Sequence, residues 1–557
     1  MKPNEYNISR EKFVLVGKNR RIRDKELATK PVSYFADAFS RFKKNKASIV
    51  ATIIIAILVL FAIVAPILSP YSVSYKDGNY KYILPKNDLF VSLGIEFWDG
   101  CQTKESTAHD FYYNYAIGYE TGTNAIVNQE YTVEKRLNNS RKEVLYYTYR
   151  LDSYKQVGVE FKNVTAEEYQ HIQEYQNKTG KQVIYPITSF YLRPSAKQDS
   201  DDANYWYATT IKDGKTQIPV NEKKDISESF KNIYAQVLTV EQIEEYIASL
   251  PSNSDEEKTF KDNMESDLKY MLREGDGNYN SLRIEGEDEQ QYYYARKNTS
   301  GYEIRVNYYE YYCYYHSEVL QDGIEYPSFL FGTTASGQDI FTCLASGARF
   351  SFLLAIIVAS VNLFVGAIIG AIEGYYGGKI DLIMERLIEI LSAVPFMVVI
   401  TLLNYHMEDT SPVLILFISF FLTGWIGMAG RTRMQFYRFK NQEYVLAART
   451  LGASDARIMF KHIFPNALGT LITSCVLVIP SVIFSETSLS YLGIINLNSG
   501  DMTSVGTLLA NAQPDLVTYP HMIFFPSLFI CLLMLSFNLF GNGLRDAFNP
   551  SLRGMED

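Results

Sequence analysis

Six apolar stretches interrupt an otherwise polar chain of 557 residues. The first has 23 uncharged residues, enough for a helix to cross a hydrocarbon core about 30 Å thick. The 46 residues before it are too many for the start of a cleaved signal peptide. We therefore predict an all-α polytopic membrane protein with six transmembrane helices, at Ala47–Ser69, Phe350–Ile372, Leu387–Leu403, Pro412–Gly430, Ala467–Phe484 and Met522–Phe540.

A polar segment, residues 71–328, separates the first two apolar stretches. Alternating runs such as VLYYTYRL, QVGVEFKN, NYWYATTIK and GYEIRVNYYEYY predict strands. Thr165 and Thr239, each followed three residues later by Glu or Gln, predict helix starts, and a third helix is expected at Asp255–Arg273. Residues 274–281 are expected to form a surface loop. The segment is predicted to be a folded α+β domain, because its many aromatic residues can build a core.

Tyrosine is concentrated in this segment, which holds 34 of the 43 tyrosines in the chain. Exposed tyrosines favour recognition, because the ring supplies contact area at low entropic cost. Tyrosine also suits the strands of a small sheet. Both interpretations stay open at this stage: a surface that binds peptide or an external binding protein, or ordinary packing.

Charge sets the expected orientation. The net charge of −9 is the sum of +8 from residues 1–46, zero from residues 47–70, −14 from residues 71–330 and −3 from residues 331–557. Basic loops stay on the cytoplasmic side of a membrane. The run RFKKNK before the first span therefore places residues 1–46 in the cytoplasm, and alternation puts residues 71–328 outside and residues 546–557 inside. Near the third span, Glu385, Arg386 and Glu389 are expected to pair along one helix face at a solvated helix end, and the alternative is a contact that links the cytoplasmic gate to an ATPase.

Chemistry-bearing motifs are few. The sequence contains no G-x-x-x-x-G-K-[ST] phosphate loop, no nucleophile with a matching base, no nucleic-acid module and no His or Cys pair at metal-ligand spacing. We expect no catalytic residue, no metal site and no ATP hydrolysis by this chain. Cys101 and Cys313 stand near the two ends of the polar segment, where either a disulfide bridge or two free thiols is compatible with an extracellular domain.

The loop at residues 431–465 is the most informative stretch. It carries seven Lys or Arg against two acids, which predicts a cytoplasmic position. Glu443–Leu451 and Ser454–His462 are expected to be two short helices joined at Gly452, with Ser454 as a cap and Pro465 at the start of the next span. Ala447 and Ala448 leave the first helix nearly smooth, so another surface could approach it closely. The simpler alternative is an amphipathic helix lying beside the membrane.

This loop resembles the "EAA" loop of ABC importer permeases, in which small residues precede a Gly and, thirteen residues later, a Pro. The phrase EYVLAARTLGASDARIMFKHIFPNAL is similar to the oligopeptide/dipeptide/nickel branch, in its C-type subunit. The resemblance implies that the loop couples the membrane subunit to an ATPase. Leu446 replaces the usual Glu, and Glu443 one turn earlier is the candidate substitute. The implied coupling residues are Glu443, Ala447, Ala448, Gly452, Ala453, Ser454 and Pro465.

Further phrases resemble the same branch, over roughly residues 31–70 and 329–553. They include RFKKNKASIV, SETSLSYLGI, GNGLRDAFNPSLR and FLFGTTASGQDIFTCLASGARFSFLLAI, where Thr334 and Gln338 replace the usual Asp and Arg. The implied fold is that of an ABC type I importer permease with an inserted domain. The implied divisions are residues 1–46, a first helix at 47–70, the insert at 71–328, a permease core at 329–545 that contains the loop, and a tail at 546–557.

The resemblance also implies an assembly. Its members would be this chain, a second homologous permease, two ABC ATPases that use ATP, and an extracellular substrate-binding lipoprotein, in the lipid of a bacterial plasma membrane. Peptides are the expected substrate, with nickel or small glycans as alternatives. A membrane-anchored extracellular ligand-binding receptor is the alternative of another class, and it would need no coupling loop.

Overall fold

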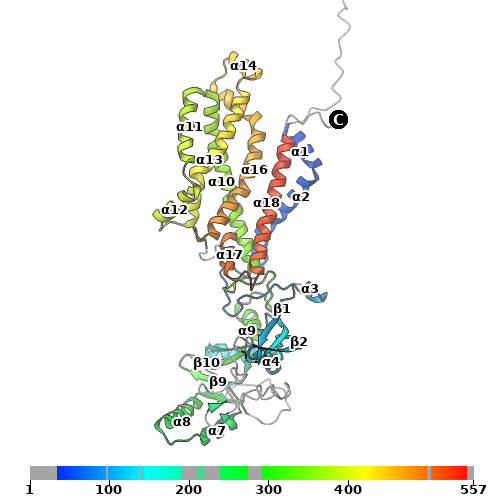
Figure 1. Cartoon of the computed structure of the whole chain (residues 1–557), viewed down its shortest axis with the longest axis vertical. Coiled ribbons are helices and arrows are strands. Elements are labelled where there is room, and N and C mark those ends of the chain that lie inside the picture. The colour runs from blue at the N-terminus through cyan, green and yellow to red at the C-terminus, as the bar shows by residue number, and fades with distance from the viewer. Residues whose placement is uncertain are drawn as a thin grey trace, which may run out of the picture.

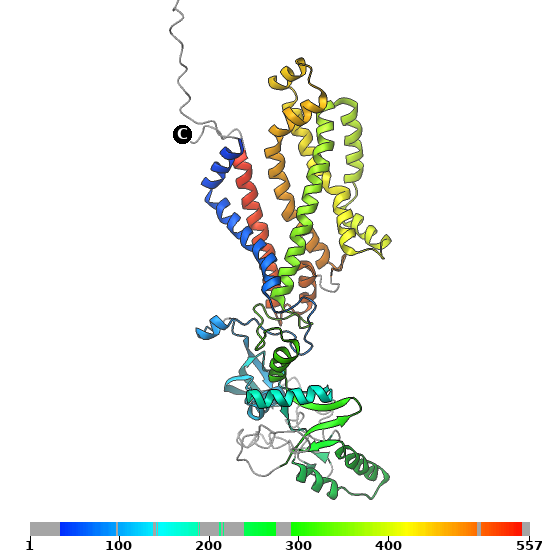
Figure 2. The ribbon, with the colours of Figure 1, turned by 180° about the vertical axis from the view of Figure 1, so that it is seen from behind.

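The computed structural model describes residues 34–95, 98–137, 141, 143–187, 189, 211–212, 215–216, 239–273, 291–497 and 503–548. The molecule is elongated, with a helical bundle along its long axis and a mixed α/β insert at one end (Figure 1). The N-terminal helix α1 (Tyr34–Lys44), the end of the last helix and the short helix α14 (Glu443–Thr450) lie at the end of the bundle far from the insert (Figures 1 and 2).

Among the described residues, five helices are long and apolar enough to cross a membrane. They are α2 (Lys46–Leu68), α10 (Ile340–Tyr376), α13 (Pro412–Phe439), the continuous helix Asp455–Tyr491 and α18 (His521–Phe548). The continuous helix comprises α15 (Asp455–Arg457), the π-helical turn η4 (Ile458–Ile463) and α16 (Phe464–Tyr491). Helix α17 (Val505–Ala512) packs between α16, α18 and α10 and is followed by the 3₁₀ turn η5 (Gln513–Asp515). The helical membrane architecture predicted from hydropathy is confirmed.

The third predicted span, Leu387–Leu403, is not one straight helix. It is a pair, α11 (Gly378–Ser392) and α12 (Phe396–His406), bent by 70°. Pro395 stands at the break, as the N-cap of α12. Proline has no N–H for an i→i−4 hydrogen bond, and its ring disfavours helical backbone at the preceding residue. Pro395 therefore accounts for the bend between α11 and α12.

Glycines bring α10 and α13 into close contact. Gly366, Gly370 and Gly374 lie four residues apart on one face of α10, where a Cβ on Gly366 or Gly374 would meet the Cβ of Met428 at 2.7 Å or that of Phe436 at 2.5 Å. Packing between helices in lipid depends on such small residues, because apolar area gives no advantage over lipid tails.

The described part of the insert contains two main antiparallel sheets. The first has the order β1-β3-β2, from β1 (Cys101–Thr107), β2 (Ile126–Leu137) and β3 (Glu143–Asp152). The second has the order β4-β10-β9-β8, with β5 also paired to β10. Its strands are β4 (Val159–Val164), β5 (Ile184–Tyr185), β8 (Met271–Arg273), β9 (Tyr293–Asn298) and β10 (Gly301–Asn307), and a small ribbon joins β6 (Ile211–Lys212) to β7 (Lys215–Thr216).

Helices cover these sheets. They are α4 (Ala108–Thr121), α5 (Ala166–Thr179), α7 (Val240–Ser249), α8 (Asp255–Leu268), α9 (Tyr308–Tyr314) and the π turn η3 (Tyr315–Leu320), whereas the short helix α3 (Asp88–Ser92) has no buried residue and extends to one side (Figure 1). Thr165 caps α5 by accepting a hydrogen bond from Glu168 N at 3.1 Å, and α7 begins directly after Thr239, as predicted. The predicted α+β character of the insert is confirmed.

Two predicted elements of the insert end earlier than expected. The helix expected at Asp255–Arg273 stops at Leu268, because Met271–Arg273 pair with β9 as a strand. The strand expected in GYEIRVNYYEYY stops at Asn307, whose side chain accepts from Tyr309 N and caps α9. In both cases, pairing or capping with a neighbour overrides the local pattern. Most of the predicted strand in NYWYATTIK and the predicted loop at 274–281 lie outside the described residues.

Packing accounts for many of the tyrosines. Their rings form the centre of the insert, often edge to face, as Tyr80 does with Tyr308 and Tyr312. Such ring pairs stabilise a core beyond the area that they bury. The tyrosines among the largest fully buried side chains are Tyr80, Tyr147, Tyr154, Tyr293, Tyr294, Tyr312 and Tyr314. For these residues the packing interpretation is the one that the structure supports.

Candidate functional site

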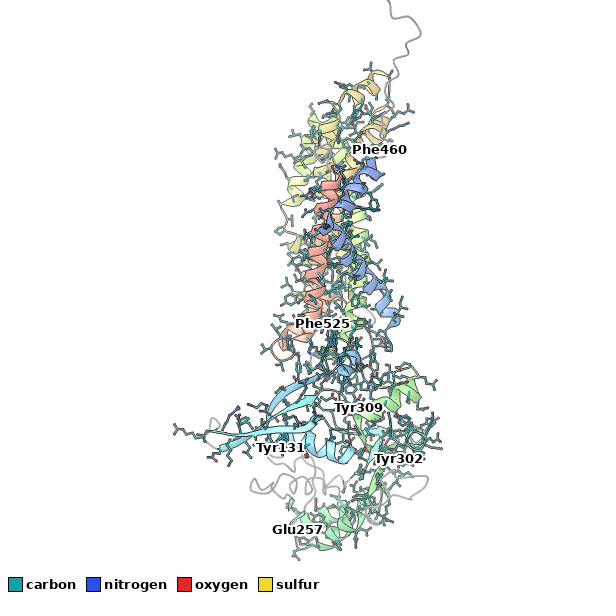
Figure 3. The ribbon with its side chains drawn as sticks, turned by 90° about the vertical axis from the view of Figure 1, so that its right-hand side faces the viewer. Tyr131, Glu257, Tyr302, Tyr309, Phe460 and Phe525 are labelled. Carbon is teal, nitrogen blue, oxygen red and sulfur yellow. The ribbon has the colours of Figure 1, made fainter. Side chains whose placement is uncertain are left out.

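The loop between α13 and α16 forms a hairpin at the end of the bundle opposite to the insert. Figure 1 shows α14 at this tip, and Figure 3 shows Phe460 of η4 beneath it, with Phe525 at the other end of the bundle. Glu443 and Ala447 are exposed and Ala448 is half-buried. Residues 443, 447 and 450 are spaced at one helical turn, so they share the outward face of α14. The sequence prediction placed this helix within one residue of its observed end.

Gly452 makes the turn of the hairpin. Its φ is +79°, in the left-handed region, and its amide donates to Arg449 O at 3.0 Å. A Cβ built at this position would meet nothing within 4 Å, so backbone conformation alone requires the glycine. The amide of Ala453 then donates to Ala448 O at 3.1 Å. This confirms the predicted left-handed glycine.

A buried cluster fixes the hairpin to the bundle. Val445 of α14 and Ile458 and Ile463 of η4 are fully buried. They pack with Ala371 and Tyr375 of α10 and Phe436 of α13. The hairpin is thus a well-packed extension of three helices, and its exposed face is held on a rigid base.

Polar contacts add to this base. The Tyr375 hydroxyl donates to Asp455 Oδ1 at 2.6 Å, and the Arg449 guanidinium lies 5.8 Å from the centre of the Tyr375 ring. On the other side, Asn466 Nδ2 donates to the Tyr444 hydroxyl at 3.2 Å. Both short helices of the hairpin are therefore bonded to a long helix of the bundle.

The second half of the hairpin differs from the prediction. A separate helix was expected at Ser454–His462, but the chain runs without a break from Asp455 to Tyr491. Pro465 lies in the first turn of α16, where a missing N–H is tolerated, directly after the wider π turn. Ser454 occupies the predicted N-cap position, although the cap is made without a side-chain hydrogen bond. A force on the tip would therefore reach the membrane span directly.

Two exposed leucines complete the outward face. Leu451, at the tip, is 87% exposed, and Leu446 is 45% exposed. Sequence reasoning noted Leu446 only as a departure from Glu and missed Leu451. The sequence did contain a signal for Leu451, because a bulky apolar residue stands directly before the turn glycine in a basic loop. Large apolar side chains that are exposed on a well-packed hairpin are typical of a docking surface.

An ion-pair cluster lies beside this base. Arg433 of α13 forms two hydrogen bonds to Asp381 of α11, at 2.6 and 2.9 Å, and lies 3.2 Å from Glu385. Arg386 pairs with Glu389 on the same helix. The predicted pairing along α11 is thus present for Arg386 and Glu389, whereas Glu385 pairs with Arg433 of α13. Bidentate arginine contacts of this kind fix the angle between two helices.

The cysteines and possible metal ligands are the remaining candidates. Cys101 and Cys313 are both free thiols, so the disulfide that the sequence left open does not form. Cys101 begins β1, while Cys313 is buried in α9. Burial raises the pKa of each thiol to about 12, which keeps both protonated at neutral pH. Within the described residues, no group of three or more His, Cys, Asp or Glu could hold a metal ion.

Comparison with known proteins bears on this arrangement. Residues 362–554 match the family described as binding-protein-dependent transport system inner membrane component. Residues 33–85 match the N-terminal transmembrane domain of oligopeptide transport permease C. An inward-facing structure of the MetNI methionine ABC transporter aligns with 37% of this chain and 96% of its own, at a TM-score of 0.29 and 14% identity.

Curated relatives are more similar. The oligopeptide transport system permease protein OppC of Bacillus subtilis is 44% identical over 223 residues, covering 40% of this chain and 72% of the relative. The dipeptide transport system permease protein DppC of the same organism is 39% identical, over 40% of this chain and 69% of its own. OppC of Escherichia coli K12 is 35% identical, over 40% and 72%. This chain therefore belongs to the family of binding-protein-dependent transport system inner membrane components.

Proposed function

We propose that this chain imports oligopeptides or dipeptides as one of two permease subunits of an ATP-driven importer, and that the hairpin 443–465 receives the force from an ATPase subunit. The observation that carries the proposal is the exposed face of α14 and Leu451, held on a buried base that continues into a membrane span. The names of the relatives support peptides as the substrate.

The proposed partners are a second permease, two ATPases and an external substrate-binding lipoprotein. Closure of the ATPase dimer on ATP would push on the hairpin, and the continuous helix 455–491 would tilt with it. Such a change needs contacts that differ between the two states of the complex. Glu443, one turn before Leu446 on the outward face, is the proposed polar contact to the ATPase in place of the missing glutamate.

The orientation is part of the proposal. The hairpin and α1 lie at one end of the bundle and the insert at the other (Figure 2). We place the hairpin end in the cytoplasm because its loop is basic. A cysteine at Ala447 should react with a membrane-impermeant maleimide in inverted vesicles and not in intact cells. Reaction in intact cells would overturn the orientation and the coupling role together.

Substrate and partners can be tested in one preparation. Purification of the tagged chain from its native host should recover two ATPases and a second permease. Cells that express the complete complex should accumulate labelled peptides, and cells without it should not. Accumulation of Ni²⁺ or small glycans in place of peptides would reassign the substrate but keep the transport role. Ligand binding in a preparation free of any ATPase would support the receptor alternative.

A further inference from the structure

A cavity of about 700 Å³ lies where the first span meets the insert. One wall is the last three turns of α2, from Ile57 to Leu68. The opposite wall is the segment that returns from the insert to α10, with Ile324, Leu330 and Phe341. In Figures 1 and 2, α2 lies at the edge of the bundle and runs down to the insert. The cavity therefore lies on the outer side of the helical bundle and not in its centre.

The walls of this cavity are apolar and open to the surroundings. Ile57, Leu60 and Leu68 are 58%, 61% and 76% exposed. On a membrane-spanning helix, side chains of this kind face hydrocarbon. Water in this apolar part of the cavity would find few polar partners, which favours an apolar occupant.

The end of the cavity next to the insert is polar. Ser69, Tyr71, Glu325 and Asp339 lie there. Asp339 accepts hydrogen bonds within the start of α10, from Thr342 Oγ1 at 2.5 Å, from Thr342 N at 2.9 Å and from Phe341 N at 3.4 Å. Glu325 is exposed and supplies a carboxylate at the mouth. The cavity thus combines an apolar body at membrane depth with an acidic polar mouth at the insert end.

We propose that this cavity binds one acyl chain of a glycerophospholipid from the leaflet on the insert side, with an ammonium-bearing head group beside Glu325. Its size favours a chain over a helix of a partner subunit, since each 5.4 Å turn of a helix 10–12 Å wide fills roughly 400–600 Å³. The cavity would accept little more than one turn.

This site is a feature of the present chain. One wall lies within residues 33–85, which match the permease N-terminal domain, but residues 324–341 fall between the two matched ranges. Ile324, Glu325 and their neighbours in the insert therefore supply part of this wall, and Leu330, Asp339 and Phe341 of the permease core supply the rest. A bound lipid would fill the space between the first span and the stem of the insert and hold the two at a fixed angle.

The test uses the full complex in nanodiscs that contain phosphatidylethanolamine with a photoreactive group near the end of an acyl chain. Peptides from residues 57–68 and 324–341 should be labelled. Leu60→Trp, which fills the cavity, should lower this labelling about ten-fold. Ile63→Trp is the matched control: Ile63 is 50% exposed on the same helix but does not line the cavity, so labelling should not change.

Further arms separate the rival occupants. Equal labelling of both variants would show ordinary surrounding lipid and overturn the site. A disulfide formed between a cysteine at Leu60 and the second permease would show that a protein helix fills the cavity, and would also overturn it. Phosphatidylglycerol should compete less well than phosphatidylethanolamine, and Glu325→Gln should remove this preference. Unchanged incorporation and melting of each variant, measured first, excludes misfolding as the cause.

Discussion

The hydroxyl of Tyr375, near the end of α10, donates a hydrogen bond to the carboxylate of Asp455, 80 residues later, at 2.6 Å. Asp455 is the first residue of the continuous helix that runs to Tyr491. This bond links the base of the hairpin to α10, which also packs against α2, α13 and α16. A load on the hairpin is thereby shared between two spans.

Removing this bond should weaken the coupling of ATP hydrolysis to transport. Tyr375→Phe keeps the ring under Arg449 but loses the hydroxyl. Because the carboxylate of Asp455 is exposed to solvent, this hydrogen bond contributes only about 1 kcal/mol to the stability of the contact. We expect fewer peptides transported per ATP hydrolysed, with normal membrane insertion. Asp455→Ala, which removes the acceptor, should have a similar effect, and the double variant should be no worse than either single one. Additive losses would contradict a direct link.

Gly452 offers a sharp backbone test. Valine at this position must adopt a positive φ, which costs about 1–2 kcal/mol, while asparagine tolerates that conformation. We expect Gly452→Val to lose transport about ten-fold or more and Gly452→Asn to retain most of it. No atom lies within 4 Å of the built Cβ, so a clash of the Cβ itself does not contribute to the difference. Equal uptake by both variants would contradict a mechanical role for this turn.

Leu451 should contribute to binding of the ATPase and little to folding. It is 87% exposed, so Leu451→Glu removes no internal packing. The same change should desolvate a charge in the proposed interface and release the ATPase during purification. Leu137→Glu in the insert, where Leu137 is 67% exposed, is the matched control and should keep the ATPase bound. Retention of the ATPase by the Leu451 variant would exclude this residue from the contact.

The close contact of α10 with α13 should be sensitive to a single methyl group. Gly370→Ala places a Cβ against Ala429 O and 2.8 Å from Thr432 Cβ, so the helices must separate. Overpacking typically costs about 1–3 kcal/mol, and we expect a lower melting temperature in detergent. Gly430→Ala is the control, because a Cβ there meets nothing within 4 Å. It should leave the melting temperature unchanged or raise it slightly, since alanine favours a helix.

The thiols of Cys101 and Cys313 should stay reduced and unreactive in the folded protein. Burial raises the pKa of each to about 12, so the thiolate fraction is very small at pH 7 and increases only as the pH approaches that value. Alkylation of the native protein at pH 7 should spare both residues. After unfolding without reductant, mass spectrometry should find all five cysteines alkylated. A product with only three alkylated cysteines, whose mass lacks two adducts, would reveal a bridge.

Local patterns in the sequence were enough for the helical membrane architecture, the mixed insert and the Gly452 turn. Each of these features depends on residues that are close together in the sequence. An uncharged apolar stretch, an alternation of polar and apolar residues, or a glycine between two short helices therefore predicts local structure without knowledge of the tertiary fold. The apolar pattern of Leu387–Leu403 predicted one span, but hydropathy alone does not show the bend that Pro395 introduces. Even here the residue responsible was visible in the chain.

Tertiary structure alone decided the rest. Whether Tyr80 or Tyr312 recognises a ligand or fills a core depends on which surfaces meet, and these residues turn out to be buried. The contact of Gly370 with α13, the bond from Tyr375 to Asp455 and the cavity between α2 and residues 324–341 join segments 59 to more than 260 residues apart. Nothing in the local pattern specifies such contacts, because they arise only when the packing of whole helices brings distant side chains together.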